Sequence, residues 1–329
     1  MTIDARDLGR DIGMIRLPLP IPGLQWTNAY VVRSGPEVTL IDCGVDTDEE
    51  WDALNAGLAA LGLALPDLTR VIGTHLHPDH MALAYRVVGD VGCEFVMHES
   101  TAGSLVEYND WNIERRRMRA MAIDNGVPDD EIAVAFPGEG KRPDWAGTGI
   151  PPTRTAADGD DIEIGEGRTL RVVHTPGHDN AHICLVDSRT GALFSGDHIL
   201  PRITPVIMHH ADEDRLGTYL VSLRRIEKMD LSLTYPAHVA ILQQGSLRAR
   251  QIALHHERRL GAMLQELRRG PRTAWHIVGA IFRPNLNSIG KRLALSETMT
   301  HMEYLRLNDE VERIEDEGTC YYRLPERKW

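Results

Sequence analysis

The chain has 329 residues, of which 42% are hydrophobic and 26% are charged, and its net charge is −12. This composition is that of an ordinary globular protein with a sizeable core, and one large domain with a small one is expected. No stretch approaches the roughly 18 uninterrupted apolar residues that a membrane span needs. The polar segment 1–10, which contains two aspartates, is unlike a secretory signal. We therefore expect a cytoplasmic protein with no membrane partner.

The charge is unevenly distributed along the chain. Residues 246–329 contain 15 basic and 11 acidic side chains, a net charge of +4, which leaves 21 basic and 37 acidic, a net charge of −16, for residues 1–245. The larger part would repel a polyanion, whereas the tail would tolerate one. We expect a small-molecule substrate rather than a nucleic acid, with a homodimer as a possible assembly.

The four cysteines are scattered singly, so they predict neither disulfides nor a cysteine zinc site.

The first 100 residues alternate strand and helix signals. Residues 28–42 contain the β-branched runs YVV and VTLID around a Ser-Gly-Pro turn, which predict two strands. Residues 49–61 have apolar side chains at helical spacing, and 71–73 read as a short buried strand. Residues 90–96 also have a strand-like composition. This alternation is typical of a mixed α/β fold.

The middle of the chain carries an insertion and further strands. Residues 104–130 are polar, rich in Arg and Met, and predicted to be helical, and a loop dense in Gly and Pro follows, so that 104–150 is interpreted as a lid or insertion. Strand signals then resume at 162–164, 170–173, 182–186 and 192–194. A helix over 216–228 and a strand over 231–235 come next.

The tail has a different order of elements. A long helix from Ser246 is predicted to end at Gly270-Pro271, and helices over 273–281 and 288–303 precede strands at 311–315 and 319–324. Helix, helix, helix and a hairpin is the order of a small winged-helix-like module. We therefore predict a catalytic domain over 1–245 and a C-terminal domain over 246–329.

The strongest chemical signal is Thr74-His75-Leu76-His77-Pro78-Asp79-His80, directly after a predicted strand. Imidazole and carboxylate are the ligands that zinc prefers when thiolates are absent. In an extended segment residues i and i+2 point the same way, so His75 and His77 can bind one ion together, while Asp79 and His80 turn toward a second. A single histidine is ordinarily a surface or hydrogen-bonded side chain, but four ligand-type residues at this spacing rarely serve packing.

Three further positions fit the same scheme. His178 follows Thr175-Pro176-Gly177, Asp197 follows Ser195-Gly196, and His238 follows Tyr235-Pro236-Ala237, each after a strand-like run. Seven ligands suffice for two ions, since catalytic zinc commonly keeps three protein ligands and leaves a position for water.

These motifs resemble the metallo-β-lactamase superfamily, and within it the branch of lactamase-beta-like protein 2 and glyoxalase II. The shared sequences, in the family's order over roughly 28–238, are NAYVV, LIDCG, THLHPDH, TPGHDNAH, SGDHIL and PAH. The tail resembles the winged-helix-like extension of the first branch. The resemblance implies a four-layer αββα sandwich with a C-terminal helical module. It also implies that His75, His77 and His178 hold one ion, that Asp79, His80 and His238 hold the other, and that Asp197 bridges them.

The expected cofactors are therefore two Zn²⁺ per chain, with iron or manganese as alternatives. The leading functional hypothesis is a binuclear zinc hydrolase in which a bridging hydroxide cleaves a carbonyl ester, meaning a thioester, lactone or simple ester. Asp79 would orient the nucleophile or transfer its proton. Glutathione thioesters are not favoured, because the glutathione-binding basic residues of glyoxalase II have no match.

Two other functions remain open at this point. The first is a metal-dependent endoribonuclease acting on single-stranded RNA, suggested by the resemblance and by the +4 tail, although the chain lacks the interleaved aromatic and basic residues of a single-strand channel. The second is a non-hydrolytic iron protein or scaffold, which the complete ligand set disfavours. Metal analysis separates these classes.

Several residues admit both a functional and a purely structural interpretation. His182 could support a ligand from behind or serve packing, and structural roles are preferred for His98, His198 and the pairs His209-His210 and His255-His256. Side chains that could line a substrate entrance are Tyr108, Trp111, Met118 and Met121. Arginines that could contact an anion, but more often form solvated helix faces, are Arg115, Arg116, Arg117, Arg258, Arg259, Arg268 and Arg269.

Overall fold

The computed structural model describes residues 4–21, 24–211 and 213–326, and the chain divides into two compact units. Unit 1 consists of Met1–Asn109, Arg142–Pro205 and Ser222–Ala249, and unit 2 of Asp110–Lys141, Val206–Val221 and Arg250–Trp329. Neither unit is a single stretch of sequence. Most of the predicted lid region, namely residues 110–141, belongs to the same unit as the C-terminal helices.

Unit 1 contains a seven-stranded sheet in which the strands follow one another in chain order. Its strands are β1 (Ala5–Asp7), β2 (Ile12–Ile21), β3 (Leu24–Ser34), β4 (Glu37–Ile41), β5 (Arg70–Ile72), β6 (Glu94–His98) and β7 (Arg154–Ala156). The pairs from β1 to β4 are antiparallel, whereas β4, β5, β6 and β7 run parallel to one another. The parallel strands require crossovers, which the helices between them supply.

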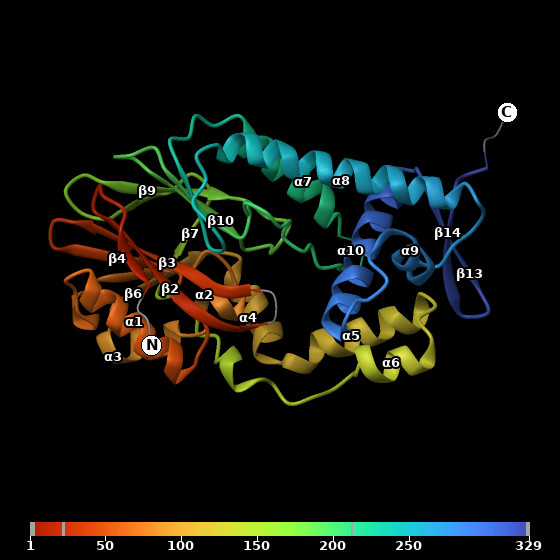
Figure 1. The fold of residues 1–329 in the computed structure, drawn as a ribbon, viewed down its shortest axis with the longest axis horizontal. Coiled ribbons are helices and arrows are strands. Elements are labelled where there is room, and N and C mark those ends of the chain that lie inside the picture. The colour runs from red at the N-terminus through yellow and green to blue at the C-terminus, as the bar shows by residue number, and fades with distance from the viewer. Residues whose placement is uncertain (1–3, 22–23, 212, 327–329) are drawn as a thin grey trace. The chain divides into compact units, whose positions relative to one another are not determined.

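A second sheet in unit 1 has five strands in the order β12-β11-β10-β9-β8. These are β8 (Asp161–Glu163), β9 (Thr169–His174), β10 (Ile183–Asp187), β11 (Leu193–Gly196) and β12 (Thr234–Pro236). Strands β8 to β11 pair antiparallel, and β12 joins β11 in parallel. Figure 1 shows β9 and β10 stacked against the first sheet.

Alternating side chains along the first sheet enter two different cores. In β5, Val71 packs into the core beneath the helices, while its neighbour Ile72 packs into the core between the sheets. Phe95 and Val96 of β6 divide in the same way. Because successive side chains of a strand point to opposite faces, a sheet buried on both sides needs such continuous apolar runs.

Helices cover the outer faces and complete four layers. The outer helices of the first sheet are α1 (Asp48–Ala60) and α3 (Ala84–Val91), as Figure 1 shows. Thr47 caps α1 by accepting from the amide of Glu50. Beside the second sheet, Ser222 of α7 (Arg215–Glu227) donates to the carbonyl of Pro176. The predicted αββα architecture is therefore present.

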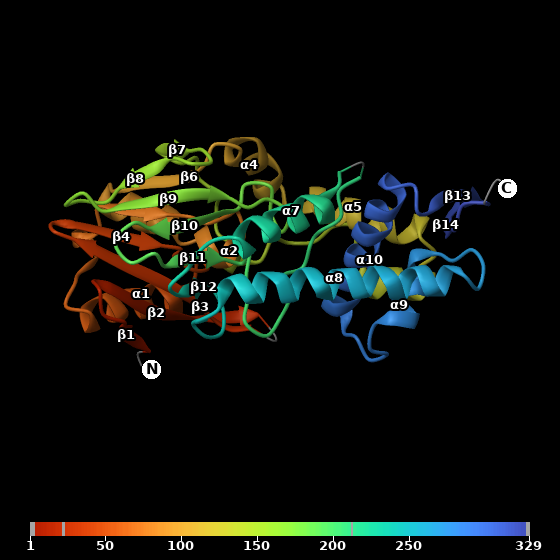
Figure 2. The ribbon, with the colours of Figure 1, turned by 90° about the horizontal axis from the view of Figure 1, so that it is seen from above.

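Unit 2 is mostly helical. Its elements are α5 (Trp111–Asp124), α6 (Asp129–Ala135), the first half of α7, most of α8 (Gly245–Leu267), α9 (Ala274–Ile281), α10 (Ser288–Leu307), and the hairpin of β13 (Glu312–Asp316) and β14 (Thr319–Arg323). Helix α8 is the long helix in the foreground of Figure 2. The predicted helix-helix-helix-hairpin order of the tail is confirmed, whereas its likeness to a winged helix stays a prediction.

The remaining helices are short. They are α2 (Pro78–Met81), α4 (Thr101–Asn109) and the 3₁₀ turns at Leu65–Asp67 and Asp144–Ala146. The strand predicted over 90–96 was wrong in its first half, because α3 continues to Val91 and ends at Gly92, whose left-handed φ of 71° stops the helix before β6 begins. Within the described ranges no helix has both the length and the apolar run needed to cross a membrane.

Candidate metal centre

Ends of strands from both sheets deliver the predicted ligands. The loop after β5 carries His75 and His77, the loop after β9 carries His178, Asp197 follows β11 directly, and His238 comes two residues after β12. Each of these strands ends at the same edge of the sandwich, so residues more than 150 positions apart in the chain become neighbours. All seven predicted ligands lie in this one region of unit 1.

Three imidazoles form the first ligand group. Nδ1 of His77 lies 3.0 Å from Nε2 of His75 and 3.0 Å from Nε2 of His178. Nitrogen atoms bound at about 2.0–2.1 Å to one zinc ion are separated by roughly this distance. His75, His77 and His178 therefore form one of the groups among the described residues whose ligand atoms are close enough to share an ion.

Asp79, His80 and His238 form the second group. Oδ2 of Asp79 lies 3.2 Å from Nε2 of His238 and 3.6 Å from Nε2 of His80. The short helix α2 starts at Pro78, after the extended backbone of His77, so Asp79 and His80 lie in its first turn. The ligand atoms of His75, His80 and Asp197 are also close enough to share an ion, so the two groups adjoin.

Asp197 lies between the two groups. Its Oδ1 lies 3.3 Å from Nε2 of His238 and 3.6 Å from Nε2 of His80, whereas its Oδ2 lies 3.7 Å from Nε2 of His178. Each carboxylate oxygen therefore faces a different group, which is the geometry required of a bridging ligand.

The buried polar atoms of this region fit a cationic occupant. Nε2 of His80, Nε2 of His238 and Oδ1 of Asp197 are fully buried and make no hydrogen bond within the described part of the chain. Leaving such atoms without a partner is unfavourable. The carboxylate oxygen and, once the rings have lost their extra proton, the two nitrogens direct lone pairs toward one point, so a metal ion suits them and an apolar ligand does not.

Hydrogen bonds behind the ligands fix their tautomers. The carboxylate of Asp42 accepts from Nδ1 of His80 at 2.8 Å, and the carbonyl of Trp26 accepts from Nδ1 of His238 at 3.0 Å. Thr74 donates its hydroxyl to Asp42 and lies 3.0 Å from Nδ1 of His75. In each case the proton on Nδ1 leaves the lone pair of Nε2 facing the centre.

His182 supports the bridging position rather than joining a ligand group. Its Nε2 accepts from the backbone amide of Asp197 at 3.1 Å, and its Nδ1 lies 2.8 Å from Oγ1 of Thr175. Gly196 makes this contact possible, because its φ is 47° and a Cβ there would lie 2.7 Å from Nε2 of His182. Of the two interpretations left open for His182, the geometry favours the supporting one.

Burial and charge set the protonation of the ligands. Burial lowers the pKa of His75 well below its usual value and also lowers that of His77, so both imidazoles are neutral. Burial acts to raise the pKa of Asp79, but the charge of His80 and the contact with His238 outweigh it and lower the pKa to about 2. Asp79 is therefore ionised, as a metal ligand must be.

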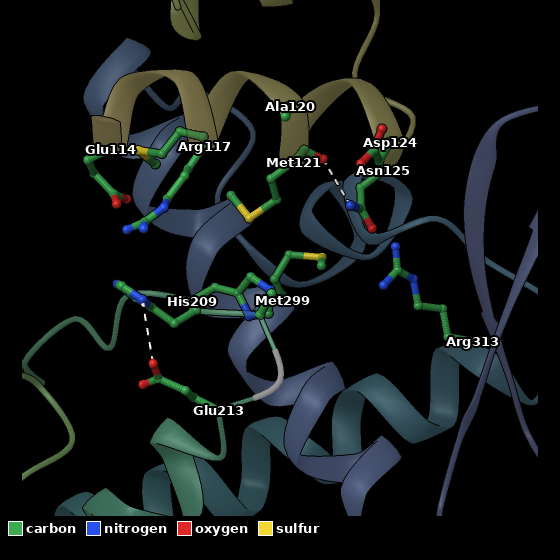
Figure 3. Close-up of a pocket in the computed structure, with 13 residues that line it drawn as sticks. Glu114, Arg117, Ala120, Met121, Asp124, Asn125, His209, Glu213, Met299 and Arg313 are labelled. Atoms are coloured by element: carbon green, nitrogen blue, oxygen red, sulfur yellow. Dashed lines mark hydrogen bonds and ion pairs between the residues drawn. The ribbon is translucent and has the colours of Figure 1, made fainter. Parts of the chain in front are cut away.

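The other histidines singled out in the sequence lie outside the two groups. His98 stacks on His174, with ring centroids 3.9 Å apart, and burial lowers the pKa of His198 to about 3. His209 and His210 line a cavity of about 450 Å³ in unit 2 (Figure 3).

Asp42, which the sequence analysis did not select as a site residue, could have been found from its place directly after a strand, as for the ligands.

The same cavity includes part of the predicted substrate entrance. Met118 and Met121 of α5 line it together with Met299 of α10, and Arg117 and Arg313 also contribute to its wall (Figure 3). Tyr108 belongs to unit 1 instead, where it donates to the carbonyl of Ala146. The cavity lies wholly within unit 2.

Comparison with known proteins agrees with this geometry. A family profile described as the Metallo-beta-lactamase superfamily matches residues 25–238, which include all seven predicted ligands. The chain belongs to the metallo-beta-lactamase superfamily. A second profile, described as Metallo-beta-lactamase-like, C-terminal domain, matches residues 260–324. The resemblance inferred from the motifs is therefore confirmed.

Full-length relatives within the superfamily share both parts of the chain. The probable metallo-hydrolase YqjP of Bacillus subtilis is 26% identical over 96% of this chain and 99% of its own length. Two crystal structures superpose over nearly the whole chain. A metallo-beta-lactamase family protein of Thermus thermophilus is 28% identical, with a TM-score of 0.79 over 97% of this chain and 100% of its own. A beta-lactamase domain protein of Burkholderia ambifaria is 27% identical, with a TM-score of 0.82 over 98% and 94%.

Other relatives match only part of the chain. An atrochrysone carboxyl ACP thioesterase of Aspergillus fumigatus is 26% identical over 67% of this chain, which spans only 39% of that enzyme's length. A similarly named thioesterase of Emericella nidulans is 26% identical over 64% of this chain and 51% of its own length. Metal-dependent hydrolysis is the activity class that these findings support for the chain.

Proposed function

We propose that this chain is a hydrolase that holds two zinc ions and cleaves a carbonyl ester, with a thioester as the first candidate and a lactone or simple ester next. The observation that carries the proposal is the division of the Asp197 carboxylate, with Oδ1 toward His80 and His238 and Oδ2 toward His178. A bridging carboxylate is needed only where two ions lie side by side.

Bound at these groups, two divalent cations would supply an ionised water and polarise the carbonyl that is attacked. The residues of the chain contribute position and charge. His75, His77 and His178 present neutral nitrogens, and Asp79 and Asp197 present buried carboxylates that offset part of the added positive charge. No serine or cysteine nucleophile is required.

Asp79 is the proposed proton carrier. Its carboxylate is 8% exposed and its Oδ2 lies 3.2 Å from Nε2 of His238, so it is held in place at the side of the centre. A carboxylate there can orient the attacking water and pass its proton to the leaving group. This role, like the ligand assignments, is part of the proposal.

Support for a thioester comes from the named thioesterases among the relatives, which match 67% and 64% of this chain. We infer the thioester class for this chain from that similarity alone. The −16 net charge of residues 1–245 opposes a nucleic acid substrate, which carries a charge on every nucleotide.

The test is an activity panel with the full chain loaded with zinc. Acyl thioesters of coenzyme A and of carrier protein, homoserine lactones and aryl esters would be compared with a chelator-treated sample. Asp197→Asn should lose activity, whereas Asp160→Asn, an exposed carboxylate on the turn before β8, should not. Absence of turnover across the whole panel, with two zinc ions per chain verified, would overturn the proposal.

The endoribonuclease hypothesis is tested separately. Binding of single-stranded RNA to the full chain should be weak and nearly independent of salt if the acidic catalytic part dominates. A steep decrease in affinity with increasing salt, together with cleavage by the zinc-loaded chain, would replace the ester hypothesis by this one.

A further inference from the structure

A further group of potential ligands lies in unit 2, apart from the proposed centre. His256 on α8 and Glu297 and His301 on α10 have ligand atoms that all lie within 4.8 Å of one another. Both histidines have no exposed surface, and Glu297 is 9% exposed. Glu297 and His301 are four residues apart on one helix, so they share a face and point together toward α8.

The two imidazoles are arranged as ligands of one ion would be. Nδ1 of His256 lies 3.1 Å from Nε2 of His301, a separation close to the 3.0 Å found between His75 and His77. Nδ1 of His301 donates to the backbone carbonyl of Glu297 at 2.7 Å. That bond places the proton on Nδ1 and leaves the lone pair of Nε2 facing His256, as in metal-bound histidines.

Two further polar atoms of the group are Nε2 of His256 and Oε2 of Glu297. Nε2 of His256 is fully buried and makes no hydrogen bond within the described ranges. Arg259 pairs with Oε1 of Glu297, so the second carboxylate oxygen, Oε2, can accept another partner. Burial also lowers the pKa of His256 to about 2 and that of His301 to about 3, so both rings are neutral. A neutral His256 carries one proton. On Nδ1 that proton forms an ordinary hydrogen bond to Nε2 of His301, whereas on Nε2 it leaves two lone pairs facing each other at 3.1 Å, the arrangement that a cation between the rings would stabilise.

We propose that His256, Glu297 and His301 bind a single zinc-type divalent ion that links α8 to α10 within the C-terminal module. Two imidazoles and one carboxylate are a ligand set that Zn²⁺ and related transition metals prefer. The ion is structural in this proposal, since its ligands are enclosed between helices. Arg259 competes with the ion for Glu297, so the affinity is lower than at a site free of cationic side chains.

Zinc content of the full chain tests the proposal. After equilibrium dialysis against micromolar Zn²⁺, His256→Gln and His301→Gln should each contain about one zinc ion per chain less than the unmodified protein, because each removes one of three ligands. His255→Gln is the matched control, since His255 neighbours His256 on α8 but is outside the ligand group, and its zinc content should be unchanged. Equal zinc content in all four proteins would overturn the proposal.

An anomalous difference map locates the ion independently of any variant. Crystals of the unmodified chain equilibrated with micromolar Zn²⁺ should show a peak between His256, Glu297 and His301, separate from any peak near Asp197. Arg259→Gln should tighten zinc binding at this position by about tenfold, because it removes a nearby positive charge. A map with no peak at His301, or with one only at millimolar zinc, means that His256 and His301 form an ordinary hydrogen bond, and it would overturn the proposal even if the centre at Asp197 is occupied.

Discussion

Oδ2 of Asp42 lies 2.8 Å from Nδ1 of His80, and the same carboxylate accepts from the amide and hydroxyl of Thr74. One buried side chain at the end of β4 therefore orients a residue of the second ligand group and the residue that precedes His75. Asp42 itself has a φ of 58°, a left-handed conformation that aspartate and asparagine tolerate better than most residues.

Asp42→Asn should weaken metal binding by about 10–100-fold, because it removes the charge behind His80 and keeps the size and backbone preference of the side chain. Activity at limiting zinc should fall in parallel and recover partly at high zinc. Asp52→Asn, an exposed carboxylate on α1, serves as the control. Unchanged zinc affinity in Asp42→Asn would show that the hydrogen bond to His80 does not contribute to the centre.

Gly196→Ala should disturb the centre through the position of Asp197. Its Cβ would lie 2.7 Å from Nε2 of His182 and 2.8 Å from Oγ1 of Thr74, so the loop must shift by more than zinc coordination tolerates. We expect a loss of zinc affinity of about tenfold or more, measured by competition with a chromogenic chelator. Gly159→Ala shares the positive φ but has no atom within 4 Å of the added methyl group, so it should retain full affinity.

Asp197→Asn tests the bridging role. Removing one charge and one anionic oxygen between the groups should reduce the zinc content below two per chain and lower kcat/KM by more than about 100-fold, since losing a ligand costs more than losing its supporting partner. Zinc content and kcat/KM would be measured on the same preparation. If Asp197→Asn retained two tightly bound ions, the carboxylate would not be the bridge.

The buried ion pair between Arg168 and Asp187 gives a prediction about stability. Both side chains are fully buried, with Nε and Nη2 of Arg168 donating to the carboxylate at 2.8 and 2.7 Å. Burial acts to raise the pKa of Asp187, but these bonds and one from Thr190 outweigh it and lower the pKa. The free energy of unfolding therefore includes a contribution that is present above pH of about 4 and is lost as the pH falls through the lowered pKa.

Asp187→Asn should reduce the free energy of unfolding at pH 7 by about 3–5 kcal/mol, because it leaves a buried guanidinium without its counter-charge. Denaturant titrations at pH 7 and pH 3 would measure it, and the difference between variant and unmodified protein should shrink at the lower pH. Asp161→Asn, which breaks the exposed pair with Arg171, should have little effect at either pH. Equal losses for both variants would contradict this account.

Much of the fold followed from patterns that the sequence displays directly. The hairpin at 28–42, the helix at 49–61 and strands β8 to β11 lie where their β-branched runs and helical spacing predicted them, whereas β12 begins three residues later than the strand predicted over 231–235. Strand β2 was not predicted, because Pro18 and Pro20 interrupt its apolar run, and prolines are tolerated there beside a register shift between Pro18 and Ile21. Local sequence patterns do not show that a register shift in the folded sheet allows prolines within a strand.

The predicted metal ligands could be found because each follows a strand. The groups that hydrogen-bond to these ligands were harder to find. Trp26 contributes only a backbone carbonyl to His238, a contact that no side-chain motif encodes. Glu297 and His301 lie 41 and 45 positions after His256 in the chain, so the pair His255-His256 alone gave no reason to select this group. The non-contiguous make-up of unit 2 likewise depends on long-range packing.

An anomalous difference map at the zinc edge, from crystals of the full chain, shows directly whether the seven side chains hold two ions. We expect two peaks roughly 3.5–4 Å apart, one near His75, His77 and His178, the other near Asp79, His80 and His238, with Asp197 about 2.0–2.2 Å from both. A map in which these seven side chains surround no peak, from crystals whose zinc content is verified, would contradict this expectation.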